Sequence, residues 1–313
     1  MKIVLQYRAS PGFRRLLDER FGKAGVAVVD ETNKAAFAVE MAACRVLLHV
    51  LEPVTRAVIE AAPRLALVQK LGIGVNTIDL EAARDRGVAV CNMPGVNSQA
   101  VAEMALSLMF AVLRRTTYLD ALTRAGEGWR PDLDALDQIG EIGGRTVGLV
   151  GLGGSAQRLA PTLAALGAEV IYTARSPKPA VPYRFAPLEA LLAQADIVSL
   201  HMPVEAATRG LIGAQAFATM KPGAILINTA RGELVDEAAL AAALRSGRLR
   251  GAGLDVFANE PVGADHPLLA FPQVVASPHA AWLTQETLAR SLDAALENCR
   301  RLAASEPLLN QVV

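Results

Sequence analysis

The sequence offers little from which a disulfide framework or a metal site could be built. Its 313 residues include only three cysteines, Cys44, Cys91 and Cys299, which lie far apart and follow no paired spacing. This pattern predicts neither a disulfide scaffold nor a zinc site, and we expect no bound metal. We expect the three thiols to be small buried groups in a reduced, cytoplasmic protein.

A charge excess and a long apolar run are also missing. Lys plus Arg and Asp plus Glu both number 31, so the net charge gives no attraction to nucleic acid or anionic membranes. The hydrophobic residues make up 52% of the chain but are dispersed, and no run reaches the ~18 residues of a membrane span. The first ten residues, MKIVLQYRAS, pass directly into a strand-like pattern, which predicts no signal peptide.

Short β-rich runs alternate with longer helical runs along the whole chain, which is typical of β-α-β units around a parallel sheet. The chain is long enough for two domains, each with its own core. A first series of strands is expected at residues 2–7, 27–30, 46–50, 66–72 and 89–92. A second series of six is expected at 145–154, 168–174, 195–201, 224–230, 250–256 and 274–279.

Two long helical patterns separate and follow these series. The Ala-, Leu- and Met-rich residues 97–126 predict one long helix, and residues 284–305 predict another. We therefore expect an α/β protein of two Rossmann-like domains. The predicted layout is a discontinuous, flavodoxin-like substrate-binding domain (1–97 and 285–313) with a doubly wound dinucleotide-binding domain (98–284) inserted into it. A cleft between two such domains would be the natural place for a substrate.

A glycine-rich turn follows the first strand of the second series. Gly151, Gly153 and Ala156 satisfy the pattern G-x-G-x-x-G/A, with a strand before them and a helical run, 157–167, after them. In such a turn the first glycine allows the tight bend, the second lets the backbone approach a pyrophosphate, and the third small residue packs helix on strand. Because glycine turns between strand and helix are common, a purely structural turn stays open.

Three polar signals stand at the ends of successive strands in this second series. Arg231 follows an apolar strand, and its guanidinium could hold a carboxylate while polarising a neighbouring carbonyl. The segment GLDVFANEP contributes Asp255 and Glu260, and His279 ends the last strand. A glutamate against one ring nitrogen would fix the tautomer of the histidine, which could then act as acid and base. Together these are the parts needed for hydride transfer to a 2-oxo acid.

Several segments together resemble the D-isomer specific 2-hydroxyacid dehydrogenases, from about residue 45 to 300 and in that family's order. They include APRLALVQKLGIGVNTIDLEAARDRGVAVCNMPG, GLVGLGGSA, LHMPVEAATRGLI, MKPGAILINTARGELVDEAALAAALRSGRLRGAGLDVFANEP and VVASPHAAW. The resemblance implies that Arg231 binds the substrate carboxylate and carbonyl, that His279 is the general acid/base and that Glu260 pairs with it. It implies that the loop Leu71, Gly72, Ile73 and Gly74 binds the substrate carboxylate through its amides, and that Trp282 lies near the substrate. The cofactor-binding residues that it implies are Gly151, Gly153, Gly154, Ser155, Ala156, His201, Pro203, Thr208, Thr229, Ala230 and Asp255.

The acid that usually binds the ribose hydroxyls is missing where it would be expected. Residues 172–177 read YTARSP and offer Thr173, Arg175 and Ser176 instead. A guanidinium and a hydroxyl favour a ribose that carries a 2′-phosphate, because they give it charge-assisted hydrogen bonds. We therefore predict NADP(H) as the favoured cofactor, with NAD(H) left open.

The resulting hypothesis is a cytoplasmic NADPH-dependent reductase of a small 2-oxo acid such as glyoxylate or hydroxypyruvate. The apolar residues 100–122 and the family resemblance predict a homodimer. A dehydrogenase of another small oxyanion, phosphite or formate, stays open, as does a nucleotide-sensing regulatory protein of the same fold. The sequence does not identify the side chain of the substrate.

Overall fold

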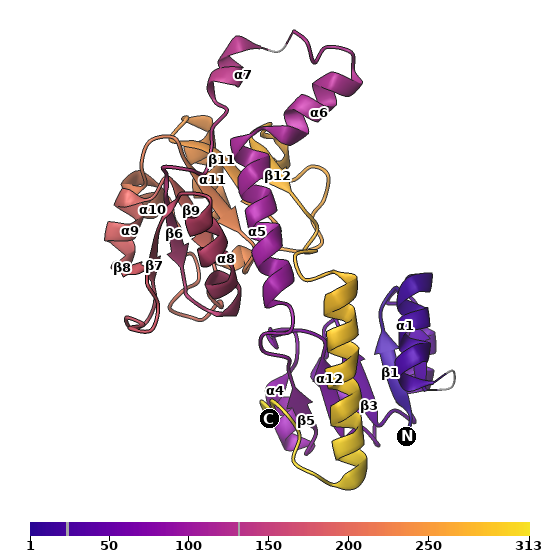
Figure 1. Ribbon diagram of the computed structural model, residues 1–313. Helices are drawn as coiled ribbons and strands as arrows, with labels where there is room; N and C mark the ends of the chain where they lie inside the picture. The colour runs from indigo at the N-terminus through magenta and orange to yellow at the C-terminus, as the bar shows by residue number, and fades with distance from the viewer. Residues whose placement is uncertain (23–24, 131) are drawn as a thin grey trace. The chain divides into compact units, whose positions relative to one another are not determined.

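The computed structural model describes residues 1–22, 25–130 and 132–313 (Figure 1). The chain forms two compact units. Unit 1 consists of Met1–Asn97 and Leu283–Val313, and unit 2 is the continuous segment Ser98–Trp282. Each unit is built around its own sheet. In the described ranges, no helix is both long enough and apolar enough to cross a lipid bilayer.

The described residues of unit 1 form a sheet of five parallel strands in the order β2-β1-β3-β4-β5. This is the strand order of flavodoxin-like folds, so the predicted class of this unit is confirmed. The strands are β1 (Ile3–Gln6), β2 (Val26–Val29), β3 (Val46–His49), β4 (Leu67–Lys70) and β5 (Ala89–Cys91).

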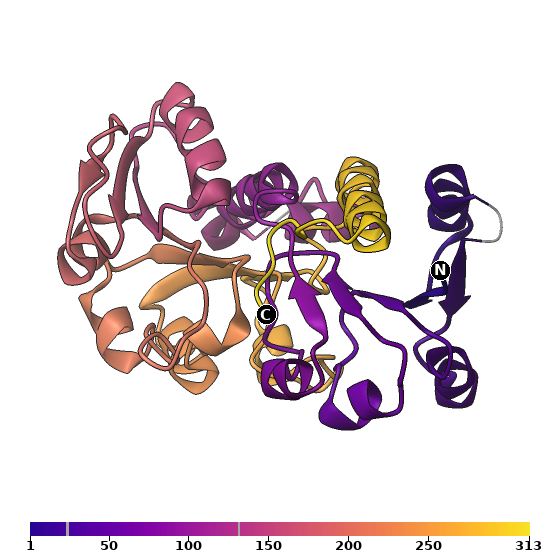
Figure 2. The ribbon, with the colours of Figure 1, turned by 90° about the horizontal axis from the view of Figure 1, so that it is seen from below.

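Helices cover both faces of this sheet. Figure 2 shows α1 and the C-terminal helix α12 on one face and the helices α2, α3 and α4 on the other. Ser10, Asp79 and Thr284 each cap a helix by accepting an amide N–H of its first turn. The helices are α1 (Pro11–Phe21), α2 (Lys34–Met41), α3 (Arg56–Glu60), α4 (Leu80–Asp85) and α12 (Gln285–Ala304).

The end of the chain lies along the free edge of β5. Gln311 forms an antiparallel bridge with Cys91, and the N–H of Val312 donates to the carbonyl of Val90 at 2.7 Å. The N–H of Val90 in turn donates to the carbonyl of Val313 at 3.1 Å. The last three residues therefore extend the sheet beyond β5.

The sheet of unit 2 has seven parallel strands among the residues described, in the order β12-β11-β10-β9-β6-β7-β8. Strand β6 has β7 on one side and β9 on the other, so the strand order reverses here, and the predicted doubly wound class is confirmed. The sequence does not predict β8, because two residues are too few to show a hydrophobic alternation. The strands are β6 (Thr146–Val150), β7 (Glu169–Thr173), β8 (Arg184–Phe185), β9 (Ile197–Leu200), β10 (Ala224–Asn228), β11 (Leu249–Leu254) and β12 (Val274–Ala276).

This sheet also lies between two layers of helices (Figure 1). One core joins the sheet to α5 and α8, and the other joins it to α9, α10 and α11. All three cysteines of the chain lie in described segments and are buried without a disulfide, as expected. The helices are α5 (Ser98–Leu113), α6 (Thr116–Arg124), α7 (Leu133–Asp137), α8 (Gly154–Ala165), α9 (Leu188–Gln194), α10 (Ala214–Thr219) and α11 (Glu237–Arg245), with 3₁₀ turns at Gly232–Leu234 and Pro267–Ala270.

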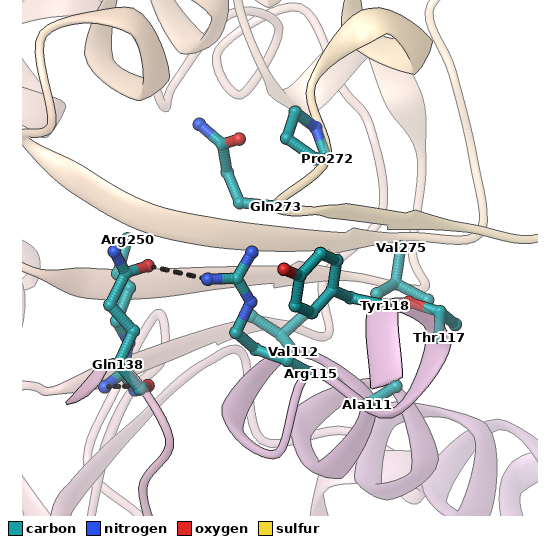
Figure 3. A pocket seen from close by; sticks show the side chains of 10 residues that line it. All are labelled: Ala111, Val112, Arg115, Thr117, Tyr118, Gln138, Arg250, Pro272, Gln273 and Val275. Carbon is teal, nitrogen blue, oxygen red and sulfur yellow. Dashed lines mark hydrogen bonds between the residues drawn. The ribbon is translucent and has the colours of Figure 1, made fainter. Parts of the chain in front are cut away.

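The prediction of one long helix over residues 97–126 is wrong. Helix α5 ends at Leu113, and Arg115 has a left-handed backbone, with φ 49°, before α6 begins. The Arg115 guanidinium lies 4.5 Å above the ring of Tyr118 and donates to Gln138 Oε1 at 3.3 Å, in a small surface hollow (Figure 3). The hydrogen bond to Gln138 comes from a residue beyond the predicted helix, so the helical composition on both sides of Arg115 gives no stop signal.

Candidate active site

The glycine turn joins β6 to α8. Gly151 has φ 97°, and a Cβ there would lie 2.5 Å from the carbonyl oxygen of His201, so only glycine fits. Gly153 is open, since the nearest atom to a Cβ there is His201 O at 3.8 Å. Ala156 is fully buried between helix and strand. The turn therefore leaves space above Gly153 for a ligand.

The first turn of α8 presents backbone N–H groups to this space. Gly153 is the N-cap residue of α8, and none of the described side chains caps the helix. The N–H groups of Gly154, Ser155 and Ala156 are the free donors of a helix N-terminus, which attract phosphate groups. These residues thus fit the pyrophosphate of a dinucleotide. Gly154 has a separate role, because a Cβ there would lie 2.5 Å from Ser98 Oγ of α5.

His201 contacts both the glycine turn and strand β9 through its ring nitrogens. Its Nδ1 lies 3.0 Å from Ser155 Oγ, and its Nε2 lies 2.9 Å from Ser199 Oγ. Burial lowers the pKa of His201 to about 4, so the ring is neutral. Because each ring nitrogen lies within hydrogen-bond distance of a hydroxyl, His201 links Ser199 of β9 to Ser155 at the N-terminus of α8.

The loop after β7 carries the residues in place of the missing acid. Thr173 is half-buried, whereas Arg175 and Ser176 are exposed. The Arg175 guanidinium forms an ion pair with Glu205, from the loop after β9. Lys178 donates through Nζ to the carbonyl of Leu152, within the glycine turn, at 2.7 Å.

The loop after β9 is fixed by its own hydrogen bonds. The Thr208 hydroxyl accepts the N–H of Glu205 at 2.7 Å and donates to the carbonyl of Pro203 at 3.1 Å. Thr208 therefore shapes the loop that flanks the glycine turn. Pro203 is exposed at the start of that loop.

Arg231 follows β10 through a turn that Asn228 holds. The Asn228 side chain accepts the N–H of Ala230 at 3.0 Å and donates to the carbonyl of Arg231 at 2.9 Å. Thr229 Oγ1 is buried and has no partner in the described part of the chain, so it is ready to bond a ligand. A buried polar atom of this kind fits a cofactor that ends here.

The Arg231 side chain is a partly buried cation. Burial lowers its pKa, which the charges of Glu233 and Glu260 partly restore, and a guanidinium stays charged at neutral pH. Gly232 allows the next loop to approach, because a Cβ there would overlap the backbone of Phe257. This close approach brings the segment of Glu260 beside Arg231.

Glu260 and His279 are in direct contact. His279 Nδ1 lies 2.6 Å from Glu260 Oε2, while Glu260 Oε1 accepts the N–H of Phe257 at 2.9 Å. Burial alone would raise the pKa of Glu260, but the hydrogen bonds from His279 and from the Phe257 N–H, together with the charges of His279 and Arg231, lower it below its ordinary value. His279 Nε2 has no partner among the described residues and is available for a ligand.

Asp255 shapes the turn that carries His279. Its carboxylate accepts the Ser277 hydroxyl at 2.5 Å and the N–H groups of Ala280 and Ala281 at 2.9 Å each. His279 itself is left-handed, with φ 53°. Burial raises the pKa of Asp255 above its ordinary value. The Asp255 carboxylate thus already accepts hydrogen bonds from the protein, and it positions His279 in addition to any contact with a cofactor. Trp282, half-buried, ends unit 2.

The remaining predicted site residues form a loop of unit 1. Leu71 is buried, Ile73 is exposed, and Gly72 has φ 152°, within the region that favours glycine. The loop is anchored by the Met93 N–H, which donates to Gly72 O at 2.8 Å, and by the Asn92 side chain, which donates to Ile73 O at 2.9 Å. Within the described chain, the N–H groups of Gly72, Ile73 and Gly74 form no hydrogen bond. Such a run of free amides can bind a carboxylate.

The sequence does not single out Asn228, Glu205 or Glu237, which the structure brings to these loops. Asn228 could have been suspected, because an amide at the end of a buried strand needs partners. Glu237 accepts the N–H of Ala258 at 2.8 Å and so fixes the Glu260 loop. Glu205 has no local signal, since its partner lies in another loop.

Comparison with known proteins gives the same family as the motifs. Residues 106–281 match the model of the D-isomer specific 2-hydroxyacid dehydrogenase NAD binding domain. The glyoxylate reductase of Aeropyrum pernix is 41% identical over 244 residues, which cover 76% of this chain and 73% of that protein. The D-3-phosphoglycerate dehydrogenase of Mycobacterium leprae is 43% identical over 253 residues, but these cover 80% of this chain and only 47% of that protein.

The whole chain is also similar to solved structures. The NADPH-dependent glyoxylate/hydroxypyruvate reductase of Sinorhizobium meliloti, in complex with NADP and malonate, aligns with a TM-score of 0.83 and 29% identity. The alignment covers 100% of this chain and 96% of that one. Both units therefore share their fold with that enzyme.

Proposed function

Because the chain belongs to the D-isomer specific 2-hydroxyacid dehydrogenase family, we propose that it reduces a small 2-oxo acid to the D-2-hydroxy acid. The substrate class is that of glyoxylate and hydroxypyruvate, which the names of the Aeropyrum and Sinorhizobium enzymes support. The observation that carries the proposal is the contact of 2.6 Å between His279 and Glu260, on a loop that packs against the Arg231 turn. A cation, an acid/base and its carboxylate partner are thus gathered at the carboxyl ends of β10, β11 and β12.

His279 is the proton donor. In the imidazolium form that acts as the acid, Nδ1 donates its hydrogen atom to the Glu260 carboxylate, and Nε2 carries the proton that meets the carbonyl oxygen of the substrate. The bound nicotinamide supplies the hydride. His279 delivers its Nε2 proton to the alkoxide oxygen, and the Glu260 carboxylate holds the ring in place throughout.

Arg231 binds the substrate carboxylate and polarises its carbonyl. The Asn228 side chain fixes the backbone on both sides of Thr229, so the guanidinium starts from a rigid turn. In unit 1, the N–H groups of Gly72, Ile73 and Gly74, which form no hydrogen bond among the described residues, suit a carboxylate, and the buried Leu71 side chain anchors their loop. Trp282 limits the size of the substrate side chain.

The favoured cofactor is NADP(H). The turn Gly151–Ala156 binds the pyrophosphate, with Ser155 and the N-terminal amides of α8 as donors. Arg175 and Ser176 bind the 2′-phosphate, and Lys178 adds a third group at the same loop. Pro203 would border the adenosine, Thr229 and Ala230 would border the nicotinamide, and Asp255 would contact the carboxamide.

The protein forms a homodimer through α5 and the segment that follows it. Helices α6 and α7 extend away from the sheet of unit 2 (Figure 1). Trp129 and Leu133 are 94% and 73% exposed, and Phe110 of α5 borders a further hollow. A second copy would cover these apolar side chains. Light scattering after gel filtration tests the dimer, and Trp129→Ser with Leu133→Gln should shift it to monomer.

Three buried, unpaired thiols agree with a cytoplasmic location.

A phosphorylated substrate is the second candidate, because of the phosphoglycerate dehydrogenase relative. Lys70, buried at the end of β4, donates to the carbonyl of Val50 and lies directly before the loop Leu71–Gly74. A cation at this position would suit a substrate with a second anionic group.

The experiment is an assay of NADPH and NADH oxidation on a panel of 2-oxo acids. The panel contains glyoxylate, hydroxypyruvate, pyruvate, 3-phosphohydroxypyruvate and branched 2-oxo acids. The proposal expects the highest kcat/KM on glyoxylate or hydroxypyruvate. Turnover confined to 3-phosphohydroxypyruvate selects the second candidate. Dinucleotide binding without turnover of any member contradicts both and favours a sensor.

A further inference from the structure

A carboxylate from another loop pairs with Arg175, in the segment 172–177 that itself carries no acid. Glu205 lies 30 residues beyond Arg175 in the chain, yet its Oε1 is the partner of the Arg175 guanidinium. Both side chains reach solvent, with exposed fractions of 83% for Arg175 and 48% for Glu205. The pair is therefore accessible to a ligand.

The strand order of unit 2 places this ion pair beside the glycine turn. Strands β7 and β9 both pair with β6, on its two sides, so the loops after them flank the turn that follows β6. The contacts agree with this placement. Lys178, from the loop after β7, donates to Leu152 O, and the carbonyl of His201, at the start of the loop after β9, lies against Gly151. The Arg175–Glu205 pair joins these two loops.

Hydrogen bonds within the loop fix the backbone of Glu205, but they do not fix its carboxylate. Its N–H donates to the Thr208 hydroxyl at 2.7 Å, and its carbonyl accepts the N–H groups of Thr208 and Arg209 at 3.0 Å each. The carboxylate, in contrast, bonds only Arg175 within the described residues. Since an exposed ion pair contributes little to stability, this carboxylate can exchange partners readily.

We propose that Glu205 reads the ribose of the dinucleotide and, through its pairing with Arg175, sets the ratio of NADPH to NADH use. This inference rests on the proposed function. With an unphosphorylated ribose, the Glu205 carboxylate accepts the 2′- and 3′-hydroxyl hydrogens, as the missing acid of the β7 loop would. With a 2′-phosphate, Arg175 leaves Glu205 for the phosphate, and Glu205 repels that phosphate. The pair thus permits both cofactors and limits the preference for NADPH.

The test is the affinity of two dinucleotides for two variants, measured by calorimetry without substrate. Glu205→Gln removes the charge but keeps the size of the side chain. NADPH should bind about five- to tenfold more tightly, because one repulsive charge is lost at close range. NADH should bind more weakly, because an amide accepts the ribose hydroxyls less well than a carboxylate. The opposite signs of the two changes are the result expected.

Glu169→Gln is the matched control. Glu169 pairs with Arg184 at 3.0 Å in another exposed ion pair of unit 2, on β7 and β8. This variant should bind both dinucleotides as the unmodified protein does. Arg175→Gln should weaken NADPH binding and leave NADH binding unchanged, which shows that the two charges act on different ribose groups.

The outcomes separate this inference from the proposed function. If the unmodified protein binds both dinucleotides and Glu205→Gln changes neither affinity, or changes both in the same direction, the role of Glu205 is wrong while the reductase stands. If neither dinucleotide binds the unmodified protein, the proposed function itself fails. If both bind and respond as expected but no 2-oxo acid is turned over, Glu205 reads the ribose and only the substrate assignment fails.

Discussion

Asn298 of α12 donates to Gln69 of β4 at 2.7 Å, although 229 residues separate them in the chain. Both side chains are buried. Asn298 also accepts the N–H of Leu309 at 2.8 Å and donates to its carbonyl at 3.1 Å, so one amide ties the last helix, the C-terminal segment and the sheet together. Gln69 in turn donates to the carbonyl of Lys70, directly before the loop Leu71–Gly74.

Asn298→Ala should destabilise the protein markedly. It leaves Gln69 Oε1 and the Leu309 N–H without their partner, and a buried unpaired group costs about 1–3 kcal/mol. We expect the free energy of unfolding in urea to fall by about 2–4 kcal/mol. Asp293→Asn, on the same helix, is the control, because it removes only the exposed pair with Arg20. Equal effects of the two variants would contradict the role of the buried network.

His279→Ala should remove most of the catalytic activity and leave cofactor binding intact. Loss of a positioned general acid lowers kcat by about 10²–10⁴. Glu260→Gln should cost less, because an amide can still orient the ring at Nδ1. Steady-state kinetics on the best 2-oxo acid, with calorimetric NADPH affinity, separate the two effects. A His279→Ala variant that keeps most of its kcat would show that another group donates the proton.

Gly151→Ala and Gly153→Ala should have different consequences. At Gly151 the positive φ and the close His201 carbonyl make any side chain strained, so thermal stability should fall. At Gly153, φ is −81° and a Cβ meets nothing closer than 3.8 Å, so the unliganded protein should keep its Tm. The methyl group would instead occupy the space of the pyrophosphate, and we expect dinucleotide affinity to fall about tenfold or more. Unchanged affinity of Gly153→Ala would exclude this turn as the phosphate site.

The free energy of unfolding should fall as the pH is lowered from 6.5 toward 4. Burial lowers the pKa of His201 from its ordinary 6.5 to about 4 and that of His49 to about 3, where Lys70 adds to the effect. Between these values the unfolded chain binds more protons than the folded chain, so stability rises with pH. Each histidine contributes a slope of up to about 1.4 kcal/mol per pH unit. Urea unfolding at several pH values measures it, and His201→Asn should reduce the slope; an unchanged slope would mean that His201 titrates normally.

Much of the architecture follows from local patterns in the sequence. Strands such as β3 and β10 are short apolar runs that end at a polar residue, and helix starts such as Asp79 and Thr284 are visible as capping residues. The glycine turn is local too, because Gly151, Gly153 and Ala156 act within one strand-turn-helix unit. These features depend on a few neighbouring residues, which is why they can be read without a structure.

The features that escaped prediction depend on distant partners. The break at Arg115 is stabilised in part by Gln138, and β8 exists because Arg184–Phe185 lies beside β7. The Arg175–Glu205 pair joins two loops that only the strand order brings together. The sequence shows the arginine and the missing acid, but it gives no sign that Glu205 pairs with that arginine. The roles of the site residues stay predictions until the variants above are measured.

The pairing of the C-terminal segment with β5 affects whether two chains can associate through this edge of the sheet. An uncovered edge strand exposes a row of unpaired N–H and C=O groups that can pair with another chain. Here the C-terminal segment 310–313 occupies the N–H and the carbonyl of Val90 and the N–H of Asn92. Removing these residues would leave the edge of β5 open as a template for intermolecular β-pairing. Aggregation should therefore precede any loss of catalytic chemistry in a shortened chain.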